Sequence, residues 1–159
     1  MNRVLSGSLA LLALLGAGGC ASQGDMHGPL ARQLTASDHC GLTAPGMLYL
    51  ADKQELAKLA NLPGQTMSLS SLAALDFSRE HLVIVALGQK NTAGYGVTLS
   101  SARLDGDVLA MEMEVQAPPP GSMVAQVLTT PCAALAITSQ GWSRLSATGE
   151  GLPAMSRER

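Results

Sequence analysis

Three cysteines, Cys20, Cys40 and Cys132, carry the thiols of this chain and are its first candidates for covalent chemistry. A thiol can act as a nucleophile beside a basic histidine, bind a metal together with other ligands at set spacings, or form a disulfide. His39 adjoins Cys40, but no other cysteine or histidine follows at metal-ligand spacing. We therefore expect no metal site and no cofactor.

Cys20 ends a segment that is typical of secretion signals. Residues 1–3 carry one positive charge, residues 4–15 are apolar, and residues 17–19 are all small. Small residues before a cysteine resemble the bacterial lipobox, in which a diacylglycerol is attached to the thiol and the chain is cut just before it. The resemblance implies a signal peptide over residues 1–19 and a lipid anchor at Cys20, with acyl chains such as palmitate.

Two neighbours of Cys20 refine this expectation. Ala17 occupies the position where Leu is most usual, and ordinary secretory cleavage after Ala21 is the alternative to lipidation. In lipoproteins of Gram-negative families, a residue other than Asp after the anchor favours the outer membrane. Ala21 therefore implies a lipid-anchored protein at the cell outer membrane, on its periplasmic face.

Cys40 and Cys132 remain once Cys20 is assigned to lipid. An even number of cysteines in an oxidising compartment favours a disulfide, which would leave no free thiol for catalysis. Two buried free thiols are the alternative.

The composition suits one β-rich domain without nucleic-acid binding. Removal of 19 residues from 159 leaves 140, which is enough for one compact domain. Apolar residues make up 47% of the chain but aromatic residues only 3%, so the core must consist of aliphatic side chains. Ten basic and twelve acidic side chains give no basic surface for nucleic acid.

Short apolar runs predict the elements of the domain. Residues 46–50 should form a strand, and Asp52 should cap a following helix with Glu55 completing a capping box. Residues 67–75 are ambiguous between helix and loop. Residues 82–87 form an unbroken apolar, β-branched run, which predicts a central strand buried on two faces.

A hairpin is expected around Gly106, because alternating apolar residues flank it on both sides. Opposed residues must share a face, so Val97 should lie opposite Val115 and Leu99 opposite Met113. A three-residue loop centred on Gly106 satisfies this pairing, whereas a two-residue loop of Asp105 and Gly106 does not.

The remaining segments set the expected boundaries. Residues 20–37 should be a tether, residues 38–140 a single domain, and residues 141–159 a flexible tail. Residues 124–128 and 133–138 are further strand candidates, separated from the hairpin by a triple-proline connector. The predicted fold is α+β and mainly β, an antiparallel sheet of about five or six strands with one or two helices packed on it.

Between Asp76 and Thr138 the chain contains these motifs in order: Asp76-Phe77-Ser78, Val83-Ile84-Val85, Gly88, Thr92-Ala93-Gly94-Tyr95-Gly96-Val97, Pro120-Gly121, Gln126-Val127-Leu128-Thr129 and Pro131. With these motifs the segment resembles the C-terminal domain of the protease complex subunit PrcB family. It implies a small extracytoplasmic β-rich domain, often on a lipoprotein, whose namesake accompanies a secreted protease. Family members commonly have Pro where this chain has Asn91.

One loop is the main candidate for partner binding, Asn91-Thr92-Ala93-Gly94-Tyr95-Gly96. The glycines allow close approach of the backbone, and the tyrosine supplies contact area. The loop also resembles the Gly-Tyr loop of chagasin-type cysteine protease inhibitors. The alternative is a turn that enters a strand, with Tyr95 packed on the sheet edge.

No motif for catalysis is evident, and Glu112 and Glu114 should lie on the solvated face of a strand. We therefore expect a non-catalytic envelope lipoprotein that binds another extracytoplasmic protein, and the family resemblance implies that it does so as the accessory subunit of a secreted or periplasmic protease. A protease inhibitor that uses residues 91–96 is the alternative, and an enzyme is not expected.

Overall fold

The computed structural model describes residues 28–159, so the predicted signal peptide and the anchor residue Cys20 lie outside the described residues. The elements along the described chain are β1 (Ala31–Ser37), β2 (Pro45–Leu50), α1 (Lys53–Leu59), α2 (Ser70–Ala73), β3 (Glu80–Leu87), β4 (Gly96–Asp105), β5 (Val108–Gln116), β6 (Cys132–Thr138), β7 (Arg144–Thr148) and β8 (Met155–Glu158).

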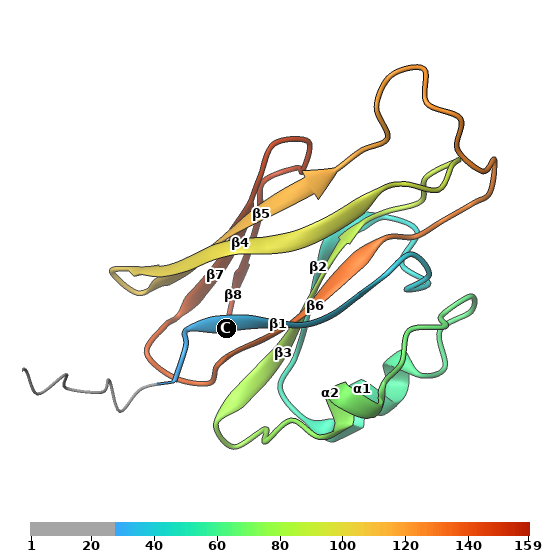
Figure 1. The fold of residues 1–159 in the computed structure, drawn as a ribbon. Helices are drawn as coiled ribbons and strands as arrows, with labels where there is room; N and C mark the ends of the chain where they lie inside the picture. The colour runs from blue at the N-terminus through green and yellow to red at the C-terminus, as the bar shows by residue number, and fades with distance from the viewer. Residues whose placement is uncertain (1–27) are drawn as a thin grey trace, which may run out of the picture.

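The strands form two four-stranded sheets, in the orders β1-β6-β3-β2 and β4-β5-β7-β8. Figure 1 shows the second sheet on one side of the first and the two helices on the other. The predicted class, α+β and mainly β, is confirmed. The described chain has more strands than the expected five or six, divides them between two sheets, and contains one parallel pair, β5 with β7.

Strand β3 lies between β6 and β2 and is buried on both faces, as predicted. Val83 and Val85 face the core between the two sheets. Leu82 and Ile84 face a second core, which the helices cover. Because neither face of β3 meets water, its sequence is continuously apolar and does not alternate.

Helix α1 begins as its sequence predicts. Asp52 accepts hydrogen bonds at Oδ1 from the amides of Gln54 (2.8 Å) and Glu55 (2.9 Å). Glu55 Oε2 in turn accepts a bond of 2.7 Å from the amide of Ala51. The two carboxylates thereby satisfy amides that the first turn leaves without partners.

The disulfide between Cys40 and Cys132 is present and completely buried. It joins the segment after β1 to the first residue of β6, 92 positions further along the chain. The predicted pairing is therefore confirmed, and it fixes the point at which the chain re-enters the first sheet.

The hairpin of β4 and β5 has the predicted pairs but a different loop. Val97 lies opposite Val115 and Leu99 opposite Met113, whereas Asp105 pairs with Val108 across two loop residues. The expected three-residue loop is wrong, because a β-bulge between Leu99 and Ser101 restores the register further along.

The expected boundaries are wrong on both sides of the domain. Residues 31–37 of the predicted tether form β1, which pairs with β6 along its length. The predicted flexible tail, residues 141–159, supplies β7 and β8, and Trp142 and Leu145 from it are buried in the inter-sheet core. The apolar residues of this segment are few, but they alternate with polar ones and pack in the core between the two sheets.

Candidate protein-binding surface

Two loops lie together at one end of the molecule: the β3–β4 loop, residues 88–95, and the β5–β6 loop, residues 117–131. Lys90 and Thr129 exchange two backbone hydrogen bonds, of 2.8 and 3.0 Å. The amide of Ala93 donates to the carbonyl of Ala125 at 3.0 Å. We call the solvent-facing side of these paired loops the two-loop surface.

Local sequence makes the β5–β6 loop stiff. Three successive prolines, residues 118–120, have fixed φ angles and no amide to extend strand β5. Gly121 then takes a φ of +77°, which suits glycine. At the far end of the loop, the carbonyl of Pro131 accepts a bond of 2.9 Å from the amide of Leu87.

Gly94 allows the loops to approach each other. Its φ is +91°, and a Cβ at this position would lie 3.2 Å from Pro118 Cγ and 3.6 Å from Val124 Cγ1. Both the backbone conformation and the narrow gap therefore favour glycine. The conformation of one loop depends on the other.

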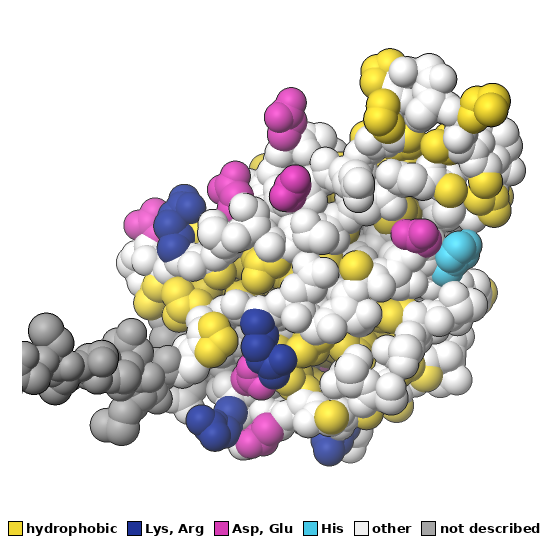
Figure 2. All heavy atoms as spheres, viewed as in Figure 1, with side chains coloured by type: hydrophobic (Ala, Val, Ile, Leu, Met, Phe, Trp, Pro, Cys, Tyr) yellow, Lys and Arg dark blue, Asp and Glu magenta, His cyan; other side chains and the backbone are white. Residues whose placement is uncertain are grey.

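The β5–β6 loop exposes large apolar side chains. Met123 is fully exposed, Leu128 is 60% exposed and Val127 is 43% exposed. Figure 2 shows yellow apolar side chains at the tip of the lobe at the upper right, where Figure 1 draws this loop in orange. No residue from 117 to 131 is charged, and Lys90 is the single charged residue of the two loops. Exposed apolar groups gathered on a stiff loop are typical of protein-interaction sites.

The Gly-Tyr loop contributes less side-chain surface than its sequence suggests. The ring of Tyr95 is half-buried and packs against the inter-sheet core. The ammonium of Lys90 lies 5.3 Å from the ring centroid and makes a cation–π contact with the ring. Asn91 and Gly94 are exposed, whereas Thr92, Ala93 and Gly96 are partly covered. This part of the candidate site therefore offers mainly backbone.

The sequence had predicted a strand over residues 124–128, which is wrong. Residues 122–128 form no strand and make an irregular loop in which the amide of Val127 donates to the carbonyl of Ala125. Two signals could have indicated a loop. The prolines and Gly121 lie directly before the segment, and its apolar residues lack the alternation that a half-buried strand requires.

The other side chains that could take part in chemistry, His39, Glu112 and Glu114, do not lie together in one site. His39 is exposed beside the disulfide, and Glu112 and Glu114 lie on the exposed face of β5, as predicted. In residues 28–159 no group of three or more histidine, cysteine, aspartate or glutamate residues could hold a metal ion. Among the same residues, no helix has the length and apolar character needed to cross a membrane.

Comparison with known proteins gives one match. Residues 81–138 match the family model described as PrcB C-terminal. The matched segment runs from β3 to the end of β6 and so contains both loops of the two-loop surface. The resemblance stated from the sequence is confirmed over these residues. No curated protein and no solved structure matches the chain.

Proposed function

Because the chain carries the PrcB C-terminal domain over residues 81–138, we propose that it is a non-catalytic accessory subunit of an envelope protease complex. In this proposal Cys20 anchors the protein by lipid to the outer membrane, and the two-loop surface binds the protease. The family description supports a protease partner. The observation that carries the binding site is the stiff, uncharged β5–β6 loop with its exposed Met123 and Leu128.

The position of this surface suits an anchored protein. At one end of the β1–β6 pair, the amide of Thr138 donates to the carbonyl of Leu30 at 2.9 Å. At the other end, the amide of Cys40 donates to the carbonyl of Thr130 at 3.1 Å. The seven residues of β6 between these points span about 23 Å at about 3.3 Å per residue. The chain therefore enters the domain at the end opposite to the two-loop surface, which favours a partner on the side away from the anchor.

The chemistry of the surface favours a protein partner over a lipid surface or nucleic acid. A single lysine gives little electrostatic attraction to phosphate groups. Exposed methionine and leucine gain most when a complementary apolar pocket removes them from water, at about 25 cal/mol per Å² of buried apolar area. The open carbonyls and amides of a loop can add directional hydrogen bonds to a partner.

The direct test is capture of the protease from detergent extracts of the envelope, with the partner identified by mass spectrometry and by peptide hydrolysis. We expect the wild-type chain to retain one protease, and Met123→Asp to lower its recovery at least about tenfold, because a buried unpaired carboxylate costs more than 1.4 kcal/mol. Ala57→Asp, on the exposed face of α1, should retain the wild-type recovery. Equal recovery by the two variants would contradict the proposal.

The same assay separates this function from inhibition through residues 91–96. An accessory subunit should leave the captured protease active, or raise its activity. Complete loss of peptide hydrolysis in the complex, reversed by substitutions at Asn91 and Gly94 but not at Met123, would show that the chain is an inhibitor instead.

A further inference from the structure

A cleft of about 560 Å³ opens at the end of the molecule opposite to the two-loop surface. It lies where residues 28–30, the turn before β3, the end of β4 and the turn after β6 meet. A neighbouring hollow of about 300 Å³ shares Gly28, Arg79 and Thr138 with it, so the two form one elongated groove. The larger part falls in the size range of small-ligand and peptide-end sites.

One part of the groove is apolar. Leu30 and Leu104 line the larger cleft, and the side chain of Leu104 at the end of β4 is 43% exposed. Exposure of a large apolar side chain to water is unfavourable, and an apolar ligand that displaces the water from the cleft removes this cost. These two leucines could therefore hold one aliphatic side chain.

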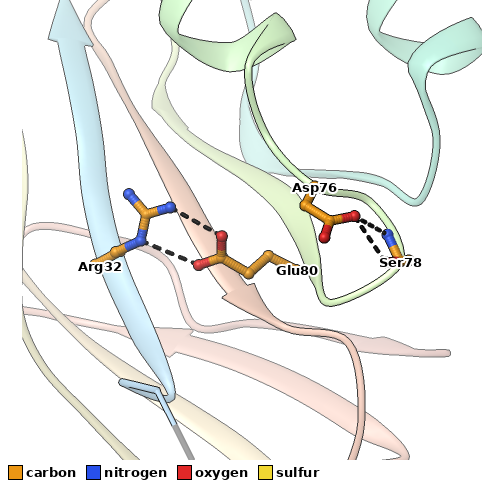
Figure 3. Close-up of polar contacts among 4 residues, drawn as sticks. All are labelled: Arg32, Asp76, Ser78 and Glu80. Carbon is orange, nitrogen blue, oxygen red and sulfur yellow. Dashed lines mark hydrogen bonds and ion pairs between the residues drawn. The ribbon is translucent and has the colours of Figure 1, made fainter.

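The charged part of the groove contains two arginines in different states. Arg32 makes a two-bond ion pair with Glu80, with Nε to Oε1 at 3.0 Å and Nη2 to Oε2 at 2.9 Å (Figure 3). Arg79 lines both parts of the groove and makes no ion pair with any carboxylate in residues 28–159. Its guanidinium remains available for a carboxylate, which it can bind with two hydrogen bonds.

Asp76 supplies an ionised acidic group in the same groove. Its Oδ1 accepts bonds from the amide (3.1 Å) and the hydroxyl (2.7 Å) of Ser78, as Figure 3 shows. These bonds, with a smaller contribution from the charge of Arg79, lower the pKa of the Asp76 carboxyl below its ordinary value. Its Oδ2 makes no hydrogen bond within residues 28–159 and could accept one from a cationic ligand group.

We propose that this groove binds the C-terminal end of a peptide that has a free carboxylate, an aliphatic last residue and a basic residue before it. Arg79 binds the carboxylate, Leu30 and Leu104 hold the last side chain, and Asp76 pairs with the basic side chain. Arg32, Asp76, Arg79 and Glu80 together have no net charge. A ligand with both a carboxylate and a cation therefore fits better than a simple anion. The site is independent of the partner proposed for the two-loop surface.

The test is calorimetric titration of the full chain with the peptide acetyl-Gly-Lys-Leu, first with a free C-terminal carboxylate and then as its amide. We expect saturable binding of the free acid. The wild-type protein should bind the peptide amide at least about tenfold more weakly than the free acid. Arg79→Gln should bind the free acid at least about tenfold more weakly than the wild type does, since each change removes a charge-assisted pair. Arg103→Gln removes an exposed arginine of β4 outside the groove and should bind as the wild type does.

Three results would overturn the proposal: no saturable binding, equal binding of acid and amide, or an Arg79→Gln variant with unchanged affinity. Decanoate serves as a second probe, because a fatty acid has the same carboxylate and apolar group but no cation. Tighter binding of decanoate than of the peptide would assign the groove to fatty acids and contradict the role of Asp76. Arg79 is exposed, so its replacement should leave the melting temperature unchanged, and this control shows that the variant is folded.

Discussion

Tyr49 and His81 lie at the centre of a residue cluster that joins the two sheets on the side away from β1 and β4. The hydroxyl of Tyr49 is 2.6 Å from Nδ1 of His81, and the Tyr49 ring packs edge-on against Trp142. The guanidinium of Arg157 lies 5.2 Å from the centroid of Tyr49, and that of Arg159 lies 5.0 Å from the centroid of Trp142. The contact of Arg157 with Tyr49 links β8 of the second sheet to β2 of the first sheet.

This cluster predicts a dependence of stability on pH. Burial of His81, which is 9% exposed, and then the nearby charge of Arg159 lower the pKa of its imidazole below the ordinary value. Glu55 acts in the opposite direction with a smaller effect. The folded protein therefore binds the proton less readily than the unfolded chain does. The contribution to stability is complete above the unfolded pKa of about 6.5 and is lost as pH falls below it.

Urea unfolding at pH 7.5 and pH 5.0 measures this effect. The wild type should lose more free energy of unfolding between the two pH values than His81→Asn, whose amide can form a hydrogen bond with the hydroxyl of Tyr49 but does not titrate. The same loss in both proteins would show that His81 does not contribute. Replacement of exposed His39 by Asn provides the control and should retain the wild-type difference.

Gly94 couples the two loops of the two-loop surface, because a side chain at this position would contact Pro118 and Val124. Gly141, in the turn before β7, has nearly the same φ, +89° against +91°, but no atom within 4 Å of the position of a Cβ. Replacement of either glycine would therefore place a side chain on a left-handed backbone, but only a side chain at position 94 would also meet a neighbouring loop.

Gly94→Ala should destabilise the protein more than Gly141→Ala does. Each substitution places a Cβ in the left-handed region, at a cost of about 1–2 kcal/mol. Only Gly94→Ala also pushes the β5–β6 loop away, so this variant should additionally increase hydrogen exchange at the amides of Ala93 and Thr129. Equal losses of stability, with unchanged exchange at these amides, would contradict the coupling of the loops.

The helix, the central strand and the hairpin show which parts of the fold can be predicted from the sequence. Structural features that depend on residues close together in the sequence could be predicted. These are the helix cap at Asp52, the buried strand β3 and the cross-strand pairs Val97–Val115 and Leu99–Met113. The hairpin loop was wrong, because a bulge and a loop of one residue fewer give the same distant pairs as a longer loop with no bulge.

The wrong predictions of a tether over residues 31–37 and of a flexible tail over residues 141–159 have a different cause. Strands β1, β7 and β8 contain many polar residues and few apolar ones, so their local signal is too weak to separate them from a tether or a tail. They form because sheets already present offer them edges to pair with. Residues 91–95 of the predicted partner-binding loop lie in the two-loop surface, whereas residues 124–128 of the neighbouring apolar loop do not form the strand expected from the sequence.

The domain has two opposite ends: one carries the two-loop surface, and the other carries the groove and the point where the chain enters. This arrangement has a clear use if the chain is held by lipid at Cys20, because the anchored end and the binding end then lie apart.

Anchoring predicts a simple result in cells. Cys20→Ser should move the protein from the membrane fraction to the soluble fraction, since a serine hydroxyl cannot form the thioether to diacylglycerol. Ala57→Asp, on the exposed face of α1, should leave the distribution unchanged. Membrane retention of the Cys20→Ser variant would contradict the lipid anchor.

Photo-crosslinking from position 123 in living cells is the most direct test of the proposed binding of an envelope protease by the β5–β6 loop. A photoreactive residue at position 123 should give one main adduct, which mass spectrometry identifies as a protease, whereas the same residue at position 57 on α1 should give none. An adduct with lipid, an adduct with a protein other than a protease complex, or equal labelling from the two positions would contradict the claim.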